Sequence, residues 1–266
     1  MSKYFAAGAM IFSAALTLIS SVVVFPTTTD AQQIYVQRGA PIPLFDGHST
    51  AGWSKAGGEP HPGWIVEDGT LHRAAGGGDL YHYATFRDFE LHFQWKIAPG
   101  GNSGVKYRVR KYGNAQLGCE YQLLDDEGAS EPNKAACLYD VYEAHPAKRP
   151  AAADVWHRAK IVVCGNRIEH WLDGVKVVDA ITGSQDWDER VARSKFRDRE
   201  GFGENREGRI FLQDHGNHVW FRHIVLIPLY CDVSTQPVFV QTACPCPVPR
   251  GCCPPACCRR RGVRCR

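Results

Sequence analysis

FELHFQWKI, residues 89–97, alternates between apolar and polar side chains at every position. The apolar positions are Phe89, Leu91, Phe93, Trp95 and Ile97. Side chains of a β-strand point alternately to its two faces, so this run predicts a strand with one face on a hydrophobic core and the other toward solvent. The stretch GVKYRVR, residues 104–110, alternates in the same way and predicts a second strand of this kind.

Further strand patterns fill the chain between residues 42 and 229. In WHRAKIVVCGNRIEHWLDGVKVVD (156–179), the turn dipeptides Gly-Asn and Asp-Gly separate three apolar segments, which predicts a three-stranded meander. Helical periodicity is confined to a turn or two near residues 186–194, and no repeat of roughly 20–50 residues is present. We therefore expect residues 42–229 to form an all-β domain, with two packed antiparallel sheets and Greek-key or jelly-roll connections.

Length and charge narrow the class of protein. The chain has 266 residues, of which 44% are hydrophobic and 22% charged, as expected of a globular protein with one large β domain. The formal charge is +3 at pH 7, but the segment from Arg250 onward holds six arginines and no acid. Subtracting those six charges from +3 leaves −3 for the rest of the chain. The composition therefore gives no indication of a nucleic-acid partner.

Residues 1–31 have the pattern of a secretory signal. Lys3 precedes the apolar run FAAGAMIFSAALTLISSVVVF (5–25), and Ala31 offers a small residue for cleavage. The run has 21 residues, which is long enough to span a bilayer. An uncleaved N-terminal anchor is thus the alternative, and it is the one membrane contact that the sequence suggests. Both interpretations place the domain outside the cytoplasm, either periplasmic, secreted or held at the cell envelope.

Eleven cysteines favour an oxidising compartment, and their distribution sets off the C-terminal segment. Cys119, Cys137 and Cys164 lie in the predicted domain, whereas the other eight lie in residues 230–266. That segment is rich in Cys, Pro and Arg, lacks apolar periodicity and matches no zinc-binding spacing. We predict that this tail is not part of the core. A disulfide-tied tail, an attachment or crosslinking segment and a mistaken reading frame remain open as explanations.

The stretch GCEYQLLDD, residues 118–126, raises the question of a binding site. Glu120 and Gln122 share one face of this predicted strand, a pattern that an ordinary solvated strand also tolerates. If the sheet is curved, its polar outer face forms a groove to which neighbouring strands contribute. Further candidates on those strands are Lys106, Arg108, Gln213 and His215. Together these carboxylate, cationic, amide and imidazole groups suit a hydrolytic or lectin-like site, whereas each one alone is more often a surface residue.

Several common enzyme motifs are absent from the sequence. It contains no G-x-S-x-G elbow, no Gly-rich phosphate loop and no H-E-x-x-H. A retaining glycosidase needs two carboxylates about 5–5.5 Å apart, which neighbouring groove positions on one strand would supply. Here those positions are Glu120 and Gln122, one acid and one amide. A standard two-carboxylate glycosidase is therefore disfavoured.

A series of motifs runs through the middle of the chain. They are LFDGHSTAGW (44–53), WIVEDGTL (64–71), RDFELHFQW (87–95), NSGVKYR (102–108), EYQLLD (120–125), LYDVY (138–142) and GRIFLQDHGNHVWFRHI (208–224). In their order and spacing, residues 42–228 resemble the 3-keto-disaccharide hydrolase domain family, long known as a domain of unknown function. The resemblance implies a concanavalin-like jelly-roll sandwich, in agreement with the strand pattern. Phe211 and His223 depart from the family pattern, and the tail lies outside it.

The resemblance also implies a reaction. Members of the family cleave glycosides whose sugar carries a ketone at C3, which makes the C2 proton acidic. A base removes that proton, the resulting enolate expels the aglycone from C1, and water then adds to the glycal. One base, a group that stabilises the enolate oxygen and an acid for the leaving group are sufficient.

On this basis we expect Glu120 or His215 to be the base and Arg108 to stabilise the oxyanion. The residues expected to bind the substrate are Asn102, Lys106, Gln122 and Gln213. No cofactor is evident, and a divalent metal on Glu120 and His215 is an alternative arrangement. The competing interpretation is a non-catalytic, lectin-like sugar-binding module on the same fold, and the tail adds an extracellular structural role as a third. The sequence does not specify an oligomeric state.

Overall fold

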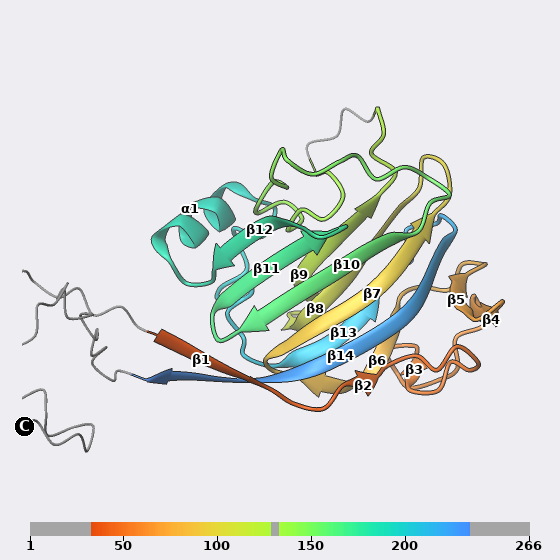
Figure 1. Ribbon diagram of the computed structural model, residues 1–266, viewed down its shortest axis with the longest axis horizontal. Coiled ribbons are helices and arrows are strands. Elements are labelled where there is room, and N and C mark those ends of the chain that lie inside the picture. The colour runs from red at the N-terminus through yellow and green to blue at the C-terminus, as the bar shows by residue number, and fades with distance from the viewer. Residues whose placement is uncertain (1–32, 129–132, 235–266) are drawn as a thin grey trace, which may run out of the picture. The chain divides into compact units, whose positions relative to one another are not determined.

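The computed structural model describes residues 33–128 and 133–234 of the chain. In these residues the protein is a β-sandwich, in which two antiparallel sheets pack face to face and a short helix lies beside them (Figure 1). The predicted all-β fold with two antiparallel sheets is confirmed. In residues 89–97 all five apolar side chains are buried, because that face of the strand packs against the opposite sheet.

Strands make up nearly all of the regular secondary structure in the described residues. The strands are β1 (Gln33–Arg38), β2 (Ile42–Pro43), β3 (Trp53–Ser54), β4 (Trp64–Glu67), β5 (Thr70–Arg73), β6 (Leu80–Phe86), β7 (Phe89–Ile97), β8 (Asn102–Tyr112), β9 (Ala115–Leu124), β10 (His157–Cys164), β11 (Arg167–Leu172), β12 (Val175–Ile181), β13 (Gly208–Leu212) and β14 (Val219–Ser234). The helix found in the same part of the chain is α1 (Gln185–Arg193). It begins after Ser184, whose hydroxyl accepts a hydrogen bond from the backbone N–H of Trp187.

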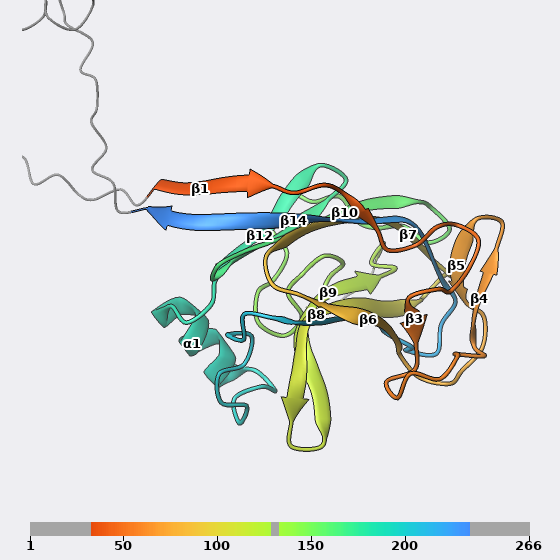
Figure 2. The ribbon, with the colours of Figure 1, turned by 90° about the horizontal axis from the view of Figure 1, so that it is seen from below.

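Strand pairing divides the sandwich into a larger and a smaller sheet. Among the described strands, nine form the larger sheet: β12-β11-β10-β7-β14-β5-β4 are neighbours in that order, and β1 and β2 also pair with β14. The smaller sheet has five strands in the described residues, in the order β3-β6-β13-β8-β9. The predicted meander is confirmed as β10-β11-β12, with turns at the Gly-Asn and Asp-Gly dipeptides. Figure 2 shows the two sheets as separate layers.

The hydrophobic core fills the space between the sheets. Trp64, Trp95 and Phe221 of the larger sheet and Tyr107 and Tyr121 of the smaller sheet are each at most 2% exposed. Aromatic side chains of this kind bury on the order of 150–250 Å² each, so they dominate the energetics of the core. Both phenol hydroxyls hydrogen-bond to β11, at 2.7 and 3.0 Å. These bonds avoid the cost of an unpaired buried polar group.

A bulge in β8 decides which way one predicted site residue points. The register of β8 against β9 shifts between Tyr107 and Arg110, and the pairing with β13 shifts at the same place. Arg108 lies in this bulge with a φ of 50°, and its side chain is 0% exposed. A bulge adds a residue to one strand and re-aims the side chains around it, so Arg108 points into the sandwich although it shares the parity of Lys106. Beyond the bulge, the β8–β9 hairpin bends away from the sheet (Figure 2).

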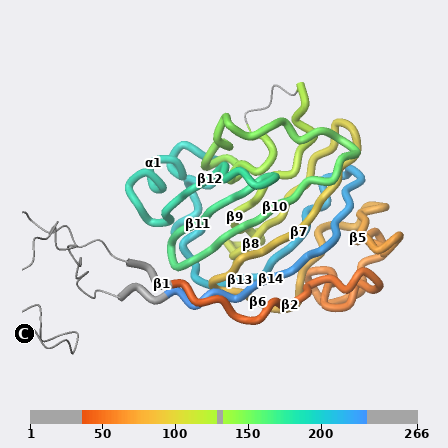
Figure 3. Tube along the Cα trace, in the orientation of Figure 1, coloured from red at the N-terminus to blue at the C-terminus, as the bar shows by residue number. Residues whose placement is uncertain are grey.

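The two ends of the described chain form a ribbon. β1 pairs antiparallel with residues 229–234 of β14, so segments from opposite ends of the sequence lie side by side (Figure 3). The compact unit is Gln33–Ser234. This unit extends beyond the predicted range 42–229 at both ends. The added residues form the ribbon, in which each strand pairs with a partner that is distant in the sequence, so local sequence patterns do not predict it.

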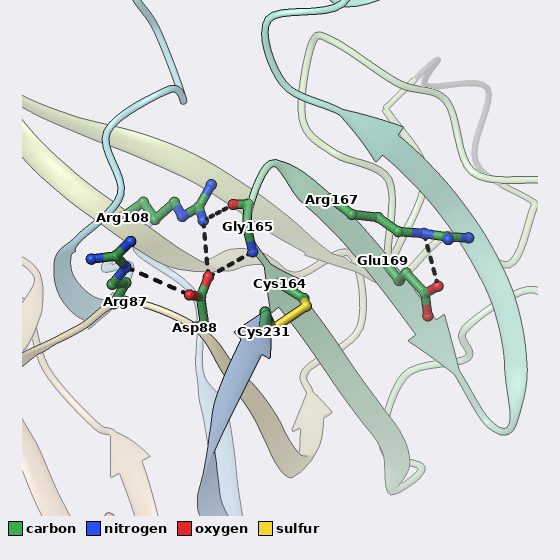
Figure 4. The surroundings of a disulfide bond; sticks show 8 residues. All are labelled: Arg87, Asp88, Arg108, Cys164, Gly165, Arg167, Glu169 and Cys231. Atoms are coloured by element: carbon green, nitrogen blue, oxygen red, sulfur yellow. Dashed lines mark hydrogen bonds and ion pairs between the residues drawn. A yellow bond between two sulfur atoms is a disulfide. The ribbon is translucent and has the colours of Figure 1, made fainter. Parts of the chain in front are cut away.

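A disulfide joins the end of β10 to β14. Cys164 and Cys231 form this bond with a Cα–Cα distance of 5.9 Å (Figure 4). Cys231 therefore belongs to the folded unit, although its position in the sequence assigned it to the tail. The predicted signal or anchor at 1–31 and most of the tail lie outside the described residues. Within the described part of the chain, no helix has the length and apolar character needed to cross a membrane.

Candidate active site

A row of side chains crosses the outer face of the smaller sheet. Lys106 of β8 pairs with Glu120 of β9 and with Phe211 of β13, which in turn pairs with Tyr81 of β6. The residue that precedes each of these four in sequence belongs to the core, so the four side chains lie on the outside of the sandwich. Nζ of Lys106 is 3.4 Å from Oε2 of Glu120 and 5.0 Å from the centre of the Phe211 ring.

A second row lies beside the first and lacks a side chain at its middle position. Gly104 of β8 pairs with Gln122 of β9, and its carbonyl accepts a hydrogen bond of 2.8 Å from the backbone N–H of Gln213. A β-carbon at Gly104 would lie 2.5 Å from Oε1 of Glu120. The close approach of the carboxylate therefore requires glycine here, and the missing side chain leaves space on the surface of the sheet.

Two amide oxygens on this surface lack protein partners. Oε1 of Gln122 and Oε1 of Gln213 are buried, and neither has a hydrogen-bond partner among the described residues. The amide nitrogen of Gln122 donates to Oδ1 of Asn102 at 3.3 Å. A buried acceptor without a donor costs about 1–3 kcal/mol, and the hydroxyl groups of a sugar are donors that would relieve this cost. The structure thus brings together the four residues expected to bind substrate: Asn102, Lys106, Gln122 and Gln213.

Glu120 is the buried carboxylate of this site. The residue is 4% exposed, and burial raises the pKa of its carboxyl group above the ordinary value, against the opposing charges of Lys106 and Lys195. A carboxylate with a raised pKa is a stronger proton acceptor than an exposed one. The arrangement of a base beside a cation suits the removal of a proton from carbon and the stabilisation of the negative charge that results.

Lys195 reaches the site from the segment that follows α1. Its Nζ is 4.0 Å from the centre of the Tyr139 ring, and its backbone N–H donates to Oδ2 of Asp140 at 2.7 Å. The backbone N–H of Tyr139 donates to the carbonyl of Glu120 at 3.0 Å. This bond holds the segment around Tyr139 and Asp140, which Lys195 contacts, against the edge strand β9. Lys195 is exposed at the surface, and partial desolvation of its ammonium group lowers its pKa, although the charge of Glu120 opposes the shift. A lysine with a lowered pKa releases its proton more readily and can act as a general acid.

Asp79, immediately before β6, adds a second carboxylate at the edge of the site. It accepts a hydrogen bond of 2.9 Å from the backbone N–H of Asp214. Burial raises the pKa of Asp79, and Lys106 acts against this shift. Neither Asp79 nor Lys195 is expected from the sequence, because both lie outside the alternating strand segments and belong to no motif that would mark them.

A pocket of about 340 Å³ opens beside Gln122 and Tyr139. Its lining residues are Gly100, Asn102, Gln122, Leu124, Asp125, Asn133 and Tyr139. Two of the lining residues are neighbours of Glu120 and Lys195. Gln122 shares a face of β9 with Glu120, and the Tyr139 ring lies against the ammonium group of Lys195. The volume lies in the range of about 300–1,000 Å³ that is usual for small-molecule sites. Its amide, carboxylate and phenol groups suit a polar ligand such as a sugar.

One of the predicted catalytic residues, Arg108, does not join this group. Nη2 of Arg108 donates to the carbonyl of Gly165 and lies 3.6 Å from Oδ1 of Asp88, close to the disulfide (Figure 4). The expectation that its guanidinium lies in the groove is not met, because the bulge in β8 turns it inward. His215 is exposed on the loop between β13 and β14. Of the three residues expected to act in catalysis, Glu120 pairs directly with the substrate-binding candidate Lys106, whereas the role of His215 stays a prediction.

The alternative metal arrangement has no ligand set in the structure. In residues 33–128 and 133–234, no group of three or more His, Cys, Asp or Glu side chains is placed to hold a metal ion. The near neighbour of Glu120 is the ammonium group of Lys106, which would repel a divalent cation. The residues present therefore do not fit the metal that was considered for Glu120 and His215.

Fold and site together define the class of this protein. It is a β-sandwich whose smaller sheet presents a buried carboxylate, a lysine and unpartnered amides beside a pocket. These features are those of a carbohydrate-active enzyme, and the comparisons with known proteins agree. The profile of the 3-keto-alpha-glucoside-1,2-lyase-like domain matches residues 40–227, and the chain belongs to this family. By family, then, it is an enzyme that acts on 3-keto sugars.

Individual relatives agree with this assignment. The 3-keto-disaccharide hydrolase of Bacteroides thetaiotaomicron is 32% identical over 234 residues, which cover 73% of this chain and 80% of the relative. A crystal structure from Parabacteroides distasonis, of a protein provisionally assigned as a glycosyl hydrolase, is 29% identical with a TM-score of 0.64, over 70% of this chain and 92% of its own. A second such structure from that organism is 24% identical with a TM-score of 0.58, over 71% and 98%, and shows the fold alone.

Proposed function

We propose that the enzyme cleaves 3-keto-glycosides by elimination followed by hydration. Glu120 removes the C2 proton, and the electron pair of the C2–H bond forms a C2–C3 double bond with the negative charge on the C3 oxygen. The enolate then collapses: the C3 carbonyl reforms, a C1–C2 double bond forms, and the bond from C1 to the aglycone oxygen breaks. Addition of water across the C1–C2 double bond releases the free 3-keto sugar.

One observation carries the proposal: the buried carboxylate of Glu120, with its raised pKa, lies 3.4 Å from the ammonium group of Lys106. The carboxylate accepts the proton, and Lys106 stabilises the enolate oxygen, the role expected of Arg108. A positioned base contributes typically about 10²–10⁴-fold, and charge stabilisation in a water-poor site is often the larger effect. Lys195, the second cation beside Glu120, donates a proton to the departing aglycone oxygen.

The activity is tested with a 4-nitrophenyl 3-keto-glucoside and its unoxidised parent. We expect nitrophenol from the keto compound and none from the parent. Glu120→Gln preserves the size of the side chain but removes the base, so turnover should fall by about a hundredfold or more while the unfolding midpoint stays the same. Glu59→Gln, at an exposed position, is the matched control and should keep full activity. Equal turnover by Glu120→Gln and wild type would rule out this mechanism.

A second candidate function is sugar binding without turnover. The unpartnered amide oxygens of Gln122 and Gln213 favour it, since they need only a ligand with hydroxyl groups. The same experiment separates the two functions. Tight binding of the unoxidised glucoside, with no aglycone released from the keto compound, would identify a binding module.

We further infer that the enzyme works outside the cytoplasm. The disulfide between Cys164 and Cys231 supports this location, because such bonds persist in oxidising compartments, and so does the signal-like segment at 1–31. Cell fractionation combined with N-terminal sequencing of the mature protein provides the test. Recovery of the chain in the cytoplasmic fraction, with both cysteines reduced, would contradict the inference.

A further inference from the structure

The outer face of the larger sheet carries tryptophans interleaved with cations. We refer to one set of residues as the aromatic–basic face: Lys96, Trp156, Arg158, Lys160, Trp171, Trp220 and Arg222. Each has a buried neighbour in the sequence, so their side chains lie outside the core. This face and the groove belong to different sheets and therefore to opposite sides of the sandwich, as the two layers in Figure 2 show.

The cations of this face lie against the indole rings. Nζ of Lys96 is 4.5 Å from the centre of the Trp220 ring and 5.6 Å from that of Trp156. The guanidinium of Arg222 is 4.0 Å from the Trp156 ring, and Nζ of Lys160 is 3.8 Å from the ring of its cross-strand neighbour Trp171. Cation–π attraction stabilises contacts of this kind, so rings and cations fix one another's positions on the sheet.

Four cations of this face have no carboxylate partner in the part of the chain that the structure describes. Within the described residues, none of the cations Lys96, Arg158, Lys160 and Arg222 forms an ion pair with a carboxylate. The acids nearest to these cations have other partners. Glu169 and Asp179 pair with Arg167 and Lys176, and Glu169 and Glu67 accept hydrogen bonds from the indole N–H groups of Trp171 and Trp220. Adjacent strands lie about 4.8 Å apart, so four unpaired cations on neighbouring strands create a local positive potential. A positive potential of this kind attracts anionic ligands.

We propose that the aromatic–basic face binds an acidic polysaccharide. Carboxylate or sulfate groups of such a polymer pair with the four cations, three of which the indole rings hold in place on the sheet. A membrane surface fits less well, because it calls for exposed large apolar side chains. In the described residues, none of those lies on the central strands β7 and β10. A polymer bound here leaves the groove on the opposite face open.

Binding is measured with the full-length protein, polygalacturonate as the acidic probe and uncharged dextran as the neutral one. We expect polygalacturonate to bind and dextran to bind at least tenfold more weakly. Lys96→Gln combined with Lys160→Gln should weaken polygalacturonate binding by about tenfold or more and make it less dependent on salt, because two charge contacts are lost. Turnover of a small 3-keto-glucoside should be the same in this variant as in wild type, so failure of this proposal is distinguishable from failure of the proposed activity.

The matched control removes two cations elsewhere, Lys111→Gln on the β8–β9 hairpin and Arg197→Gln after α1, and should bind within about twofold of wild type. The arginine-rich end of the chain is identical in all variants, so differences between them report on the face alone. Equal weakening in the control, or equal affinity for dextran, would overturn the proposal. Tighter binding of single-stranded poly(dT) or of anionic phosphatidylglycerol vesicles than of polygalacturonate would assign the face to a different partner and overturn it as well.

Discussion

Gly104 and Glu120 lie on neighbouring strands so close that a β-carbon on the glycine would be 2.5 Å from Oε1 of the glutamate. The backbone of Gly104 is outside the left-handed region, so conformational freedom is not the reason for glycine at this position. The reason is space: the sheet accommodates either a side chain at 104 or the carboxylate in its buried position.

Gly104→Ala should therefore reduce activity without unfolding the protein. The methyl group would collide with the end of a flexible side chain, so the carboxylate of Glu120 would move and the strand would stay. A displacement of about 1 Å at a reacting group can cost about a hundredfold in rate, and we expect a loss of ten- to a hundredfold with an unchanged unfolding midpoint. In the control Gly76→Ala, the new atom would make an ordinary contact at 3.6 Å. Full activity of Gly104→Ala would show that the position of the carboxylate does not matter.

The pH dependence of kcat/KM should be bell-shaped. Glu120 acts deprotonated, so the rate rises as pH rises through its pKa, which burial places above the ordinary 4.5. Lys195 acts protonated, so the rate falls as pH rises through its pKa, which partial desolvation places below the ordinary 10.5. The profile is measured with a 3-keto-disaccharide. An alkaline limb that is absent in the wild-type enzyme would remove Lys195 from the mechanism.

Lys195→Met should affect substrates according to their leaving group. A sugar alkoxide needs a proton to depart, whereas nitrophenolate leaves without one. We therefore expect a loss of about a hundredfold on a 3-keto-disaccharide and a much smaller loss on the nitrophenyl compound, with the alkaline limb abolished. Lys111→Met on the exposed hairpin is the control. Equal losses on both substrates would assign Lys195 a structural role.

Arg108→Met asks whether the buried guanidinium takes part in the reaction. Nε and Nη1 of Arg108 have no partner among the described residues, and burial lowers the pKa of the side chain. The guanidinium points away from the groove, so turnover should be unchanged, although the substitution leaves Asp88 without its partner and should lower the free energy of unfolding. Arg108→Ala leaves a cavity and should lower the free energy of unfolding by about 2–5 kcal/mol. A hundredfold loss of rate in a stable Arg108→Met variant would restore the oxyanion role.

The boundary of the domain is tested by two truncations. Ending the chain after Leu229 removes Cys231 and the strand that pairs with β1. The disulfide links positions separated by 67 residues, and loss of such a bond typically costs about 2–4 kcal/mol, so the unfolding midpoint should fall. Ending the chain after Ser234 keeps both features and is the matched control. Equal midpoints for the two truncations would mean that the ribbon and the disulfide add no stability.

The strands, and the face that Glu120 and Gln122 share, follow from the amino-acid sequence alone. Alternation at 89–97 and the turn dipeptides in 156–179 are local features, and strands occur at both places because side-chain direction along a strand follows from the backbone. Parity likewise placed the two site residues on one face, with the buried Tyr121 between them on the other. The motifs of the same segments pointed to the correct family.

The positions of Arg108, Lys195 and Asp79 depend instead on how the whole chain packs. Arg108 has the parity of a groove residue, but the bulge that turns it inward depends on the pairing of β8 with β9 and β13. Lys195 and Asp79 come from loops that reach the site through contacts with distant segments, and Cys231 finds its partner in another strand. The alternation of apolar and polar residues shows which side chains of one strand share a face. It contains no information about which strands meet or where their register shifts, since tertiary packing sets both.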